Sequence, residues 1–284
     1  RPAHRAIVVY LTAEGARVIA KASTLLSFAP ILGPIIGGYL QVAFGWRAAF
    51  VALTLLCAVL ALASWHWLAE TNHQRDLGAM RPARLIEVYG RIARSPAFWA
   101  YALPGALSYA AIFVFISGSS FVLIKVLGVP TEFYGYCFGF GVCGYLSGTL
   151  VCRRLLTAIG LERALGVGTA VTLAAGLLFA VLVALGIHHW SIVLACLFLT
   201  MAGHGINFPC AQAGAVAPFP QQAGAAAGLL GFSTMLAALL AGTWVGASHD
   251  GTLQPLATIS ASVSICLFVA ARLSAARRTL ATSS

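Results

Sequence analysis

Apolar residues fill this chain in uncharged runs of about twenty, and short segments between the runs carry nearly all the charges. A helix of about 20 apolar residues spans the hydrocarbon core of a bilayer. The pattern therefore predicts an all-α membrane protein with about eight membrane-spanning helices. Their approximate bounds are Ala22–Gln41, Ala48–Leu68, Trp99–Ser119, Phe133–Val151, Ala164–Ile187, Trp190–Ala213, Gly224–Gly246 and Leu253–Ala271.

The composition excludes a protein that folds in water. Of the 284 residues, 60% are apolar and only 8% are charged, whereas soluble domains carry roughly 25% charged residues. Between Ala164 and Ala271 the only formal charge is Asp250. The net charge of +10 does not indicate a nucleic-acid partner, because the basic residues form no stripe or patch with aromatic residues between them.

The basic residues predict the orientation of the spans. Fifteen of the 17 lysines and arginines lie in alternate connections or at the chain ends, and cytoplasmic loops are enriched in these residues. Only Arg47 and Lys125 lie on the other side. We therefore expect both ends of the chain and the Glu70–Ser95 connection to be cytoplasmic.

The Glu70–Ser95 connection is the one long polar stretch, and it divides the chain unevenly. We expect residues 1–72 to end a first half with two spans, residues 73–95 to form a central cytoplasmic loop, and residues 96–284 to form a six-helix half. Large membrane folds are commonly built from repeated halves. Six spans after the loop imply six before it, so the chain, which begins with Arg1, is expected to be a fragment that lacks four helices.

The first span combines two prolines and three glycines, namely Pro30, Gly33, Pro34, Gly37 and Gly38. Such a run makes a poor helix in water, since proline removes a donor and glycine costs about 1 kcal/mol against alanine. In lipid, small residues let helix backbones approach closely. We interpret this face as a seal against another helix; the alternative is an ordinary close helix contact.

Several segments resemble a known family in order and spacing. Gly33-Pro34-Ile35-Ile36-Gly37-Gly38 resembles the antiporter motif of major facilitator superfamily drug/proton exchangers. Other segments resemble the Bcr/CflA subfamily of bacterial drug efflux proteins. They are Ala29 to Pro34, Phe44-Gly45-Trp46-Arg47-Ala48-Ala49-Phe50, Leu68-Ala69-Glu70-Thr71, Ser117-Gly118-Ser119-Ser120-Phe121-Val122, Asn207 with Pro209, Phe219-Pro220-Gln221-Gln222-Ala223-Gly224 and His249-Asp250-Gly251.

The resemblance implies twelve helices in two halves around a central cavity, with the present spans equivalent to the fifth to twelfth. It implies a single-chain exporter of drugs or other amphipathic compounds in the bacterial inner membrane, driven by proton exchange through alternating access. This chain departs from the family's pattern at two points. Ile7-Val8 stands where the family has an Arg-Asp pair, and the family's proton-carrying aspartate belongs to a first helix that this chain lacks.

By the same resemblance, the loop after the fourth span would form a cytoplasmic gate. The gate residues would be Gly148, Arg153, Arg154 and Arg163. Cys152 stands where the family has an acidic residue, so the usual clamp between acid and arginine lacks its acid. The alternative is that these arginines only anchor the loop on the cytoplasmic side.

Polar residues within apolar spans point to a substrate cavity, because burying them unpaired costs several kcal/mol. Two interrupted spans, with Pro104-Gly105 and with Gly203-His204-Gly205, would be the seventh and tenth helices. The predicted cavity residues are Tyr101, Ser108, Tyr109, Phe113, His204, Asn207 and Phe208. Aromatic and a few polar groups suit amphipathic cations. The alternative for His204 is an interhelical hydrogen bond to a carbonyl.

Nothing in the sequence indicates catalysis, a metal or a cofactor. His188-His189 has no third ligand nearby, the seven cysteines show no paired spacing, and no phosphate-binding loop is present. We expect a transporter with small-molecule substrate, protons and lipid as partners, not an enzyme. Two alternatives stay open: a metabolite or peptide carrier of the same fold, and a non-functional truncated membrane remnant.

Overall fold

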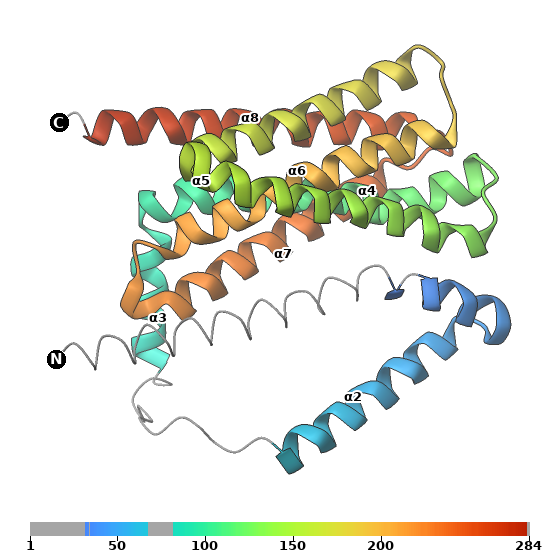
Figure 1. Cartoon of the computed structure of the whole chain (residues 1–284), viewed down its shortest axis with the longest axis horizontal. Helices are drawn as coiled ribbons and strands as arrows, with labels where there is room; N and C mark the ends of the chain where they lie inside the picture. Colours follow the sequence, from blue (N-terminus) through green and yellow to red (C-terminus); the bar gives the residue numbers. More distant parts are fainter. Residues whose placement is uncertain (1–31, 34, 68–81, 283–284) are drawn as a thin grey trace.

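The structure is a computed structural model that describes residues 32–33, 35–67 and 82–282. In these ranges the regular elements are all helical (Figure 1). They are a short apolar helix Ile35–Phe44, α2 Arg47–Trp67, α3 Pro82–Ala93, α4 Pro96–Phe121, the π-helical turn η1 Val122–Val126, α5 Thr131–Ala184, α6 Trp190–Val216, the short 3₁₀ turn η2 Pro220–Gln222, α7 Ala223–Ala247 and α8 Gln254–Thr282.

Six of these helices are long and apolar enough to cross a membrane: α2, α4, α5, α6, α7 and α8. The predicted all-α membrane protein is confirmed. The first predicted span enters the described residues only at its end, as the helix Ile35–Phe44. Pro30 and Pro34 of the predicted seal lie outside the described residues.

Helix α5 accounts for two of the predicted spans. Its 54 residues would measure about 80 Å, far more than the roughly 30 Å of a bilayer core. Gly160 breaks the helix with φ 79° and ψ 173°. Figure 1 shows α5 folding back on itself near its label, on the left of the view. We call residues 131–159 the first arm and 161–184 the second arm. The predicted span Phe133–Val151 lies in the first arm, and the predicted span Ala164–Ile187 lies in the second arm except for its last three residues. A break at one glycine thus replaces the longer loop that the sequence suggested.

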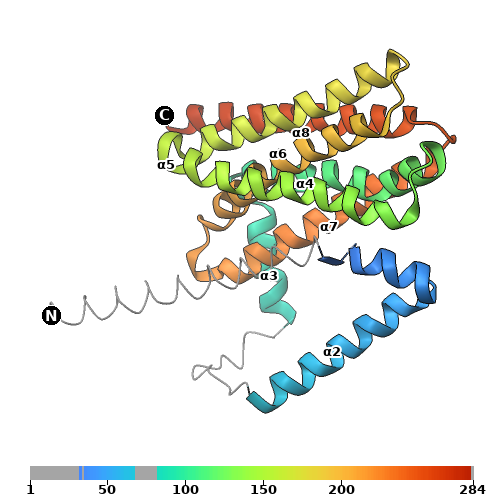
Figure 2. The same ribbon diagram turned by 45° about the vertical axis from the view of Figure 1, so that its right-hand side comes forward.

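The central connection contains a helix that the sequence analysis did not predict. Helix α3 carries apolar Val88 and Ile92 on the side that packs against the other helices, where Ile92 is fully buried. Arg91 and Glu87, whose side chains are exposed, form an ion pair of 2.7 Å. Figures 1 and 2 both show α3 running across the ends of α4 and α7 rather than alongside them.

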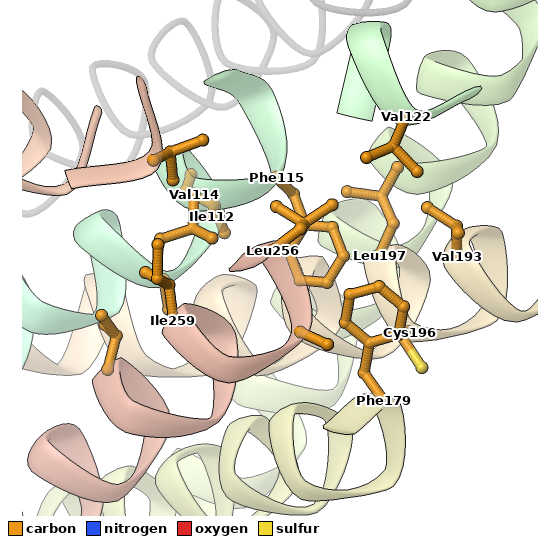
Figure 3. Close-up of a cluster of buried hydrophobic side chains, with 14 of the residues drawn as sticks. Ile112, Val114, Phe115, Val122, Phe179, Val193, Cys196, Leu197, Leu256 and Ile259 are labelled. Carbon is orange, nitrogen blue, oxygen red and sulfur yellow. The ribbon is translucent and has the colours of Figure 1, made fainter. Parts of the chain in front are cut away.

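The apolar core lies between α4, both arms of α5, α6, α7 and α8. Figure 3 shows the rings of Phe115 and Phe179 facing each other at its centre, with ring centroids 5.5 Å apart. Leu197 of α6 and Leu256 of α8 flank them (Figure 3), and all four side chains are buried. This core joins the helices after α3 into one packed unit.

Helices α5 and α6 share the most extensive contact of the structure. Gly144 and Gly148, four residues apart on the first arm, lie directly on the backbone carbonyls of Phe198 and Ala202. Gly205 of α6 lies on the carbonyl of Tyr145 in return. We call Gly144, Gly148 and Gly205 the glycine seam. Spacing small residues by four lets helices in lipid approach to backbone contact.

Among the residues that the structure describes, the basic residues are divided between the two ends of the bundle as the sequence analysis predicts. The turn at Gly160, α3 and the C-terminal end of α8 lie at one end of the bundle, which we call the Arg-rich end (Figures 1 and 2). The connections around Gly45, Gly128, Gly186 and Gly251 lie at the other end. Each of these four glycines has a positive φ, between 70° and 83°. Which end faces the cytoplasm stays a prediction.

Candidate functional site

The predicted cavity residues meet where α4 packs against α6. Ser108 of α4 and His204 of α6 form a hydrogen bond of 3.0 Å between Oγ and Nδ1. His204 is 5% exposed, Ser108 1% and Asn207 0%. The contact between His204 and Ser108 is an interhelical hydrogen bond to a side-chain hydroxyl, so a purely structural role for His204, the alternative named above, stays open.

Asn207 extends this contact into a chain of hydrogen bonds. Its Nδ2 donates to Ser108 Oγ and to Thr172 Oγ1, both at 3.2 Å, and Thr172 Oγ1 donates to the Gly168 carbonyl at 3.1 Å. We call Ser108, Thr172, His204 and Asn207 the polar relay. Since Thr172 uses its own proton on Gly168, it can only accept from Asn207. Oδ1 of Asn207 is buried and has no hydrogen-bond partner within the described ranges.

Aromatic rings surround His204. The ring centroid of Phe208 lies 5.2 Å away, that of Tyr109 5.8 Å and that of Tyr145 5.9 Å. Phe113 continues the group, stacked on Tyr109 at 6.3 Å. We call Tyr109, Phe113, Tyr145 and Phe208 the aromatic cluster. These rings are partly exposed or at the edge of the packed core, so they offer π faces beside a polar group.

The local sequence explains why His204 is held in this position. Gly203 lies against Thr172 Oγ1 and the Gly168 carbonyl of the second arm, and Gly205 lies against the Tyr145 carbonyl of the first arm. A side chain at either glycine would collide with α5, so both neighbours of His204 have to be glycine. The backbone of α6 is thereby held against both arms of α5.

Tyr101 is the one predicted cavity residue that the structure places elsewhere. Its ring packs against Gly214 of α6 and against the apolar clusters that hold Ile92 and Cys152. Tyr101 precedes Tyr109 by eight residues, about 12 Å along α4. The structure therefore brings together six of the seven predicted residues, with Tyr101 toward the Arg-rich end.

The sequence analysis missed Thr172 and Tyr145. Both carry the signal that it used elsewhere, since each is a polar side chain inside an apolar run. The sequence analysis looked for such polar residues in spans that contain a proline, and neither arm of α5 contains a proline.

Two of the predicted seal residues, Gly37 and Gly38, border a cavity. Gly38 comes near the first arm, since a Cβ atom there would lie 3.9 Å from the Thr131 carbonyl oxygen, whereas one at Gly33 or Gly37 would meet nothing within 4 Å. Tyr39 and Tyr136 join their hydroxyls across this contact at 2.8 Å. A cavity of about 560 Å³ lies beside it, lined by Gly37, Gly38, Gln41, Ala49, Ser120, Phe121, Ile124, Lys125, Thr131 and Tyr134. The sealing role stays a prediction.

The predicted gate residues lie in different surroundings. Gly148 belongs to the glycine seam, while Arg153, Arg154 and Arg163 are exposed. None of these arginines pairs with a carboxylate within the part of the chain that the structure describes. Cys152, at the position of the expected acid, is buried with its Sγ 3.7 Å from that of Cys210. The gate stays a prediction without a visible clamp.

Metal-binding side chains do not gather in the described ranges, where no three His, Cys, Asp or Glu residues lie together. The seven cysteines are free thiols. The polar relay and the aromatic cluster are the candidate site within the described residues.

Comparison with known proteins gives the family. A family model described as Major Facilitator Superfamily matches residues 2–242. A bicyclomycin resistance protein homolog of Haemophilus influenzae is 24% identical over 240 residues, 84% of this chain and 60% of that protein. Multidrug resistance protein D of Escherichia coli is 30% identical over 215 residues, 71% of this chain and 50% of that protein. A chloramphenicol resistance protein of Pseudomonas aeruginosa is 25% identical over 158 residues, 56% of this chain and 36% of that protein.

The chain spans 36% to 60% of the length of these three relatives. The predicted resemblance to Bcr/CflA-type efflux proteins is confirmed by the bicyclomycin resistance homolog. The family consists of transporters, so the prediction of a protein that is not an enzyme is also confirmed. The match over residues 2–242, on a bundle of membrane-spanning helices, shows that this chain belongs to the Major Facilitator Superfamily.

Proposed function

We propose that the protein exports amphipathic, often cationic, small molecules from the bacterial cytoplasm in exchange for protons, by alternating access. The aromatic cluster is the observation that carries this proposal. Tyr109 and Phe113 of α4 lie beside His204 and Phe208 of α6 within a transporter chain. Aromatic faces next to a few polar groups bind organic cations through stacking and cation–π contact.

The names of the relatives support an exporter of drugs. They refer to resistance to bicyclomycin, to chloramphenicol and to multiple drugs. These compounds differ in structure, and a cluster of aromatic rings selects less by shape than a site with many directed hydrogen bonds does. The cluster therefore agrees with a broad substrate range.

The contact between the helix Ile35–Phe44 and α5 supports alternating access. Gly38 and the Tyr39–Tyr136 hydroxyl pair join the two parts of the chain at the end opposite to the Arg-rich end. In our proposal the Arg-rich end is cytoplasmic, the tyrosine contact closes the far side, and Arg153, Arg154 and Arg163 border the cytoplasmic mouth. The protein works as a single chain in the inner membrane.

Transport in vesicles tests this function. The protein made from its complete reading frame is reconstituted, and tetraphenylphosphonium is added under a proton gradient. We expect release of protons that depends on the added cation. Response to an amino acid, peptide or sugar but to no cationic drug would favour the metabolite or peptide carrier. A folded protein that responds to none of these compounds would favour the non-functional remnant.

Alanine variants test the site. A cation–π contact is worth about 1 to 2 kcal/mol when partly desolvated, which corresponds to five- to thirtyfold in affinity. We expect Tyr109→Ala and Phe113→Ala each to weaken tetraphenylphosphonium binding by about this factor. Phe232→Ala is the matched control, because Phe232 of α7 is 64% exposed on the outside of the bundle. Equal effects at Phe113 and Phe232 would contradict the site.

A further inference from the structure

A second cavity, of about 420 Å³, lies between the second arm of α5 and α8, at the Arg-rich end of the bundle. Figures 1 and 2 both show these two segments together, on the side of the bundle that faces away from α2. The volume falls within the range of about 300 to 1,000 Å³ that is typical of ligand sites. Among the described residues that line this cavity, none belongs to the polar relay or the aromatic cluster.

Two arginines on neighbouring helices, Arg163 and Arg272, line this cavity. Arg163 directly precedes the predicted span Ala164–Ile187, and Arg272 directly follows the predicted span Leu253–Ala271. Both side chains are exposed. Arginines that adjoin the ends of two membrane spans lie at the depth of the lipid headgroups.

Neither guanidinium group is neutralised within the protein. Among the residues that the structure describes, no carboxylate forms an ion pair with Arg163 or Arg272. The Arg272 guanidinium lies over the ring of Phe268, 4.9 Å from its centroid. Stacking orients the planar group and leaves its N–H edge available to a second partner. Phosphate suits this edge, because a guanidinium binds it through two parallel hydrogen bonds.

Glu162 limits the charge of a ligand in this cavity. Its carboxylate also lines the cavity, and it has an interaction of its own. Two arginines and one glutamate leave the described lining with one net positive charge. A phosphodiester, with one negative charge, complements this lining, whereas a phosphomonoester carries about 1.5 to 2 negative charges at neutral pH. The phosphodiester is the group that joins the headgroup of a phospholipid to its glycerol.

Apolar side chains continue from the cavity along both helices. Val167 of the second arm lines the cavity and is exposed. Val269 and Leu273 of α8 are also exposed, and Val269 lies on the same side of the helix as Arg272 because it precedes Arg272 by three residues. A ligand with a phosphodiester at the arginines could therefore lay apolar chains along this surface.

We propose that this cavity binds the headgroup of an anionic phospholipid, with its phosphodiester between Arg163 and Arg272. Basic pockets between membrane-spanning helices bind anionic headgroups. The inference goes beyond the proposed function and does not depend on it. A lipid bound here bridges the second arm of α5 and α8, so it stabilises the folded bundle by mass action.

Thermal unfolding in detergent tests the site. The protein made from its complete reading frame is purified and titrated with phosphatidylglycerol, phosphatidylethanolamine or inorganic phosphate. A ligand that binds the folded protein raises the unfolding temperature, and the concentration that gives half of the maximum shift measures the affinity. We expect phosphatidylglycerol to act at the lowest concentration. Native mass spectrometry should show phosphatidylglycerol retained on the protein.

Two arginine variants test the charges. Arg163→Gln and Arg272→Gln should each weaken phosphatidylglycerol binding about fivefold, the usual contribution of one basic side chain to the binding of anionic lipid. Arg94→Gln is the matched control, because it removes an exposed positive charge at the same end of the bundle but outside the cavity. It should keep the wild-type affinity.

A glycine variant tests the cavity without changing any charge. Gly166 lines the cavity, and a Cβ atom there would meet nothing within 4 Å. Gly166→Leu should therefore fill the space and weaken phosphatidylglycerol binding. Gly231→Leu, at an equally open position on α7, is the control and should keep the wild-type affinity.

Glu162→Gln decides between anionic and zwitterionic lipids. It removes the negative charge from the described lining, so it should strengthen phosphatidylglycerol binding. If the cavity instead held phosphatidylethanolamine, with the ammonium group on Glu162, the same variant would weaken the binding of that lipid. This result would overturn the choice of an anionic lipid.

Three further outcomes would also overturn the inference. They are equal binding of phosphatidylglycerol by the wild type and a folded double variant of Arg163 and Arg272, an equal loss in Arg94→Gln, and an equal shift of the unfolding temperature by inorganic phosphate. None of these measurements involves transport, so their failure leaves the proposed function untouched. Protein that binds phosphatidylglycerol but releases no protons when tetraphenylphosphonium is added would contradict only the proposed function.

Discussion

The carbonyl oxygen of Ala202 on α6 occupies the place where a Cβ atom of residue 148 on α5 would have to stand. Gly148 is therefore a packing residue, and its identity follows from backbone contact rather than from a turn. The same holds for Gly144 against Phe198 one helical turn earlier. The position that sequence resemblance assigned to a cytoplasmic gate is part of a helix interface.

Alanine at the positions of the glycine seam should lower the stability of the protein, although alanine has a higher helix propensity than glycine. Gly144→Ala and Gly148→Ala should destabilise the protein by about 1 to 3 kcal/mol, because the added methyl group forces α5 and α6 apart. Gly231→Ala on α7, where a Cβ would meet nothing within 4 Å, should stabilise by up to about 1 kcal/mol. Thermal unfolding in detergent measures all three. Stabilisation by Gly148→Ala would contradict the backbone contact.

The break in α5 predicts a second glycine effect. With φ 79° and ψ 173°, Gly160 lies in a region that is essentially restricted to glycine, and other residues there cost about 1 to 3 kcal/mol. Gly160→Ala should lower the unfolding temperature. Gly166→Ala, six residues later in regular helix with free space around it, should leave it equal or higher. Two variants of equal stability would show that the turn does not need this conformation.

The start of α8 predicts a dependence on pH. Asp250 Oδ1 accepts from Thr252 Oγ1 at 2.7 Å and from Thr252 N at 2.9 Å, and Thr252 Oγ1 accepts from Gln254 N at 3.2 Å. The hydrogen bonds from Thr252 lower the pKa of Asp250 below its ordinary value of 3.8. Since the folded pKa is the lower one, the stabilisation is complete above that ordinary value and is lost as the pH falls through the lowered pKa.

Asp250→Asn should therefore unfold more easily than the wild type at pH 7, and the difference should shrink as the pH falls from 3.8 through the lowered pKa of the wild-type carboxyl. The measurement is thermal unfolding of both proteins at several pH values. A difference that is the same at pH 3 and pH 7 would mean that the charge of Asp250 does not matter for the turn.

The orientation of the bundle predicts labelling from one side. In a variant without the native cysteines, Lys125→Cys should react with a membrane-impermeant maleimide in intact cells. Arg94→Cys, at the Arg-rich end after α3, should react only after the cells are opened. Positive residues favour the cytoplasmic side, and the reverse labelling pattern would overturn the orientation together with the direction of export.

The spans could be predicted because runs such as Trp190–Ala213 carry a signal that does not depend on tertiary contacts. Their ends could not. Helical hydrogen bonds continue past the hydrocarbon boundary, so the first arm extends through Arg153 and Arg154 to Gly160. Helix α3 was missed because its charges conceal an apolar side that includes Val88 and Ile92.

Part of the candidate site was also readable in the sequence. The neighbourhood of Gly203, His204 and Asn207 could be recognised because buried polar residues in an apolar run need partners. The identity of those partners could not, since Thr172 and Tyr145 lie on two arms whose positions depend on the turn at Gly160. Tyr101 was grouped with the cavity because sequence spacing does not reveal depth along α4.

Backbone contact along Gly144, Gly148 and Gly205 also has a mechanical consequence. Two helices whose backbones touch cannot slide along each other without first separating, so α5 and α6 form one rigid unit. His204 is held in this unit by its flanking glycines, whereas Ser108 belongs to α4. Any tilting of α4 against this unit would first stretch the two hydrogen bonds that Ser108 makes to α6, with His204 and with Asn207.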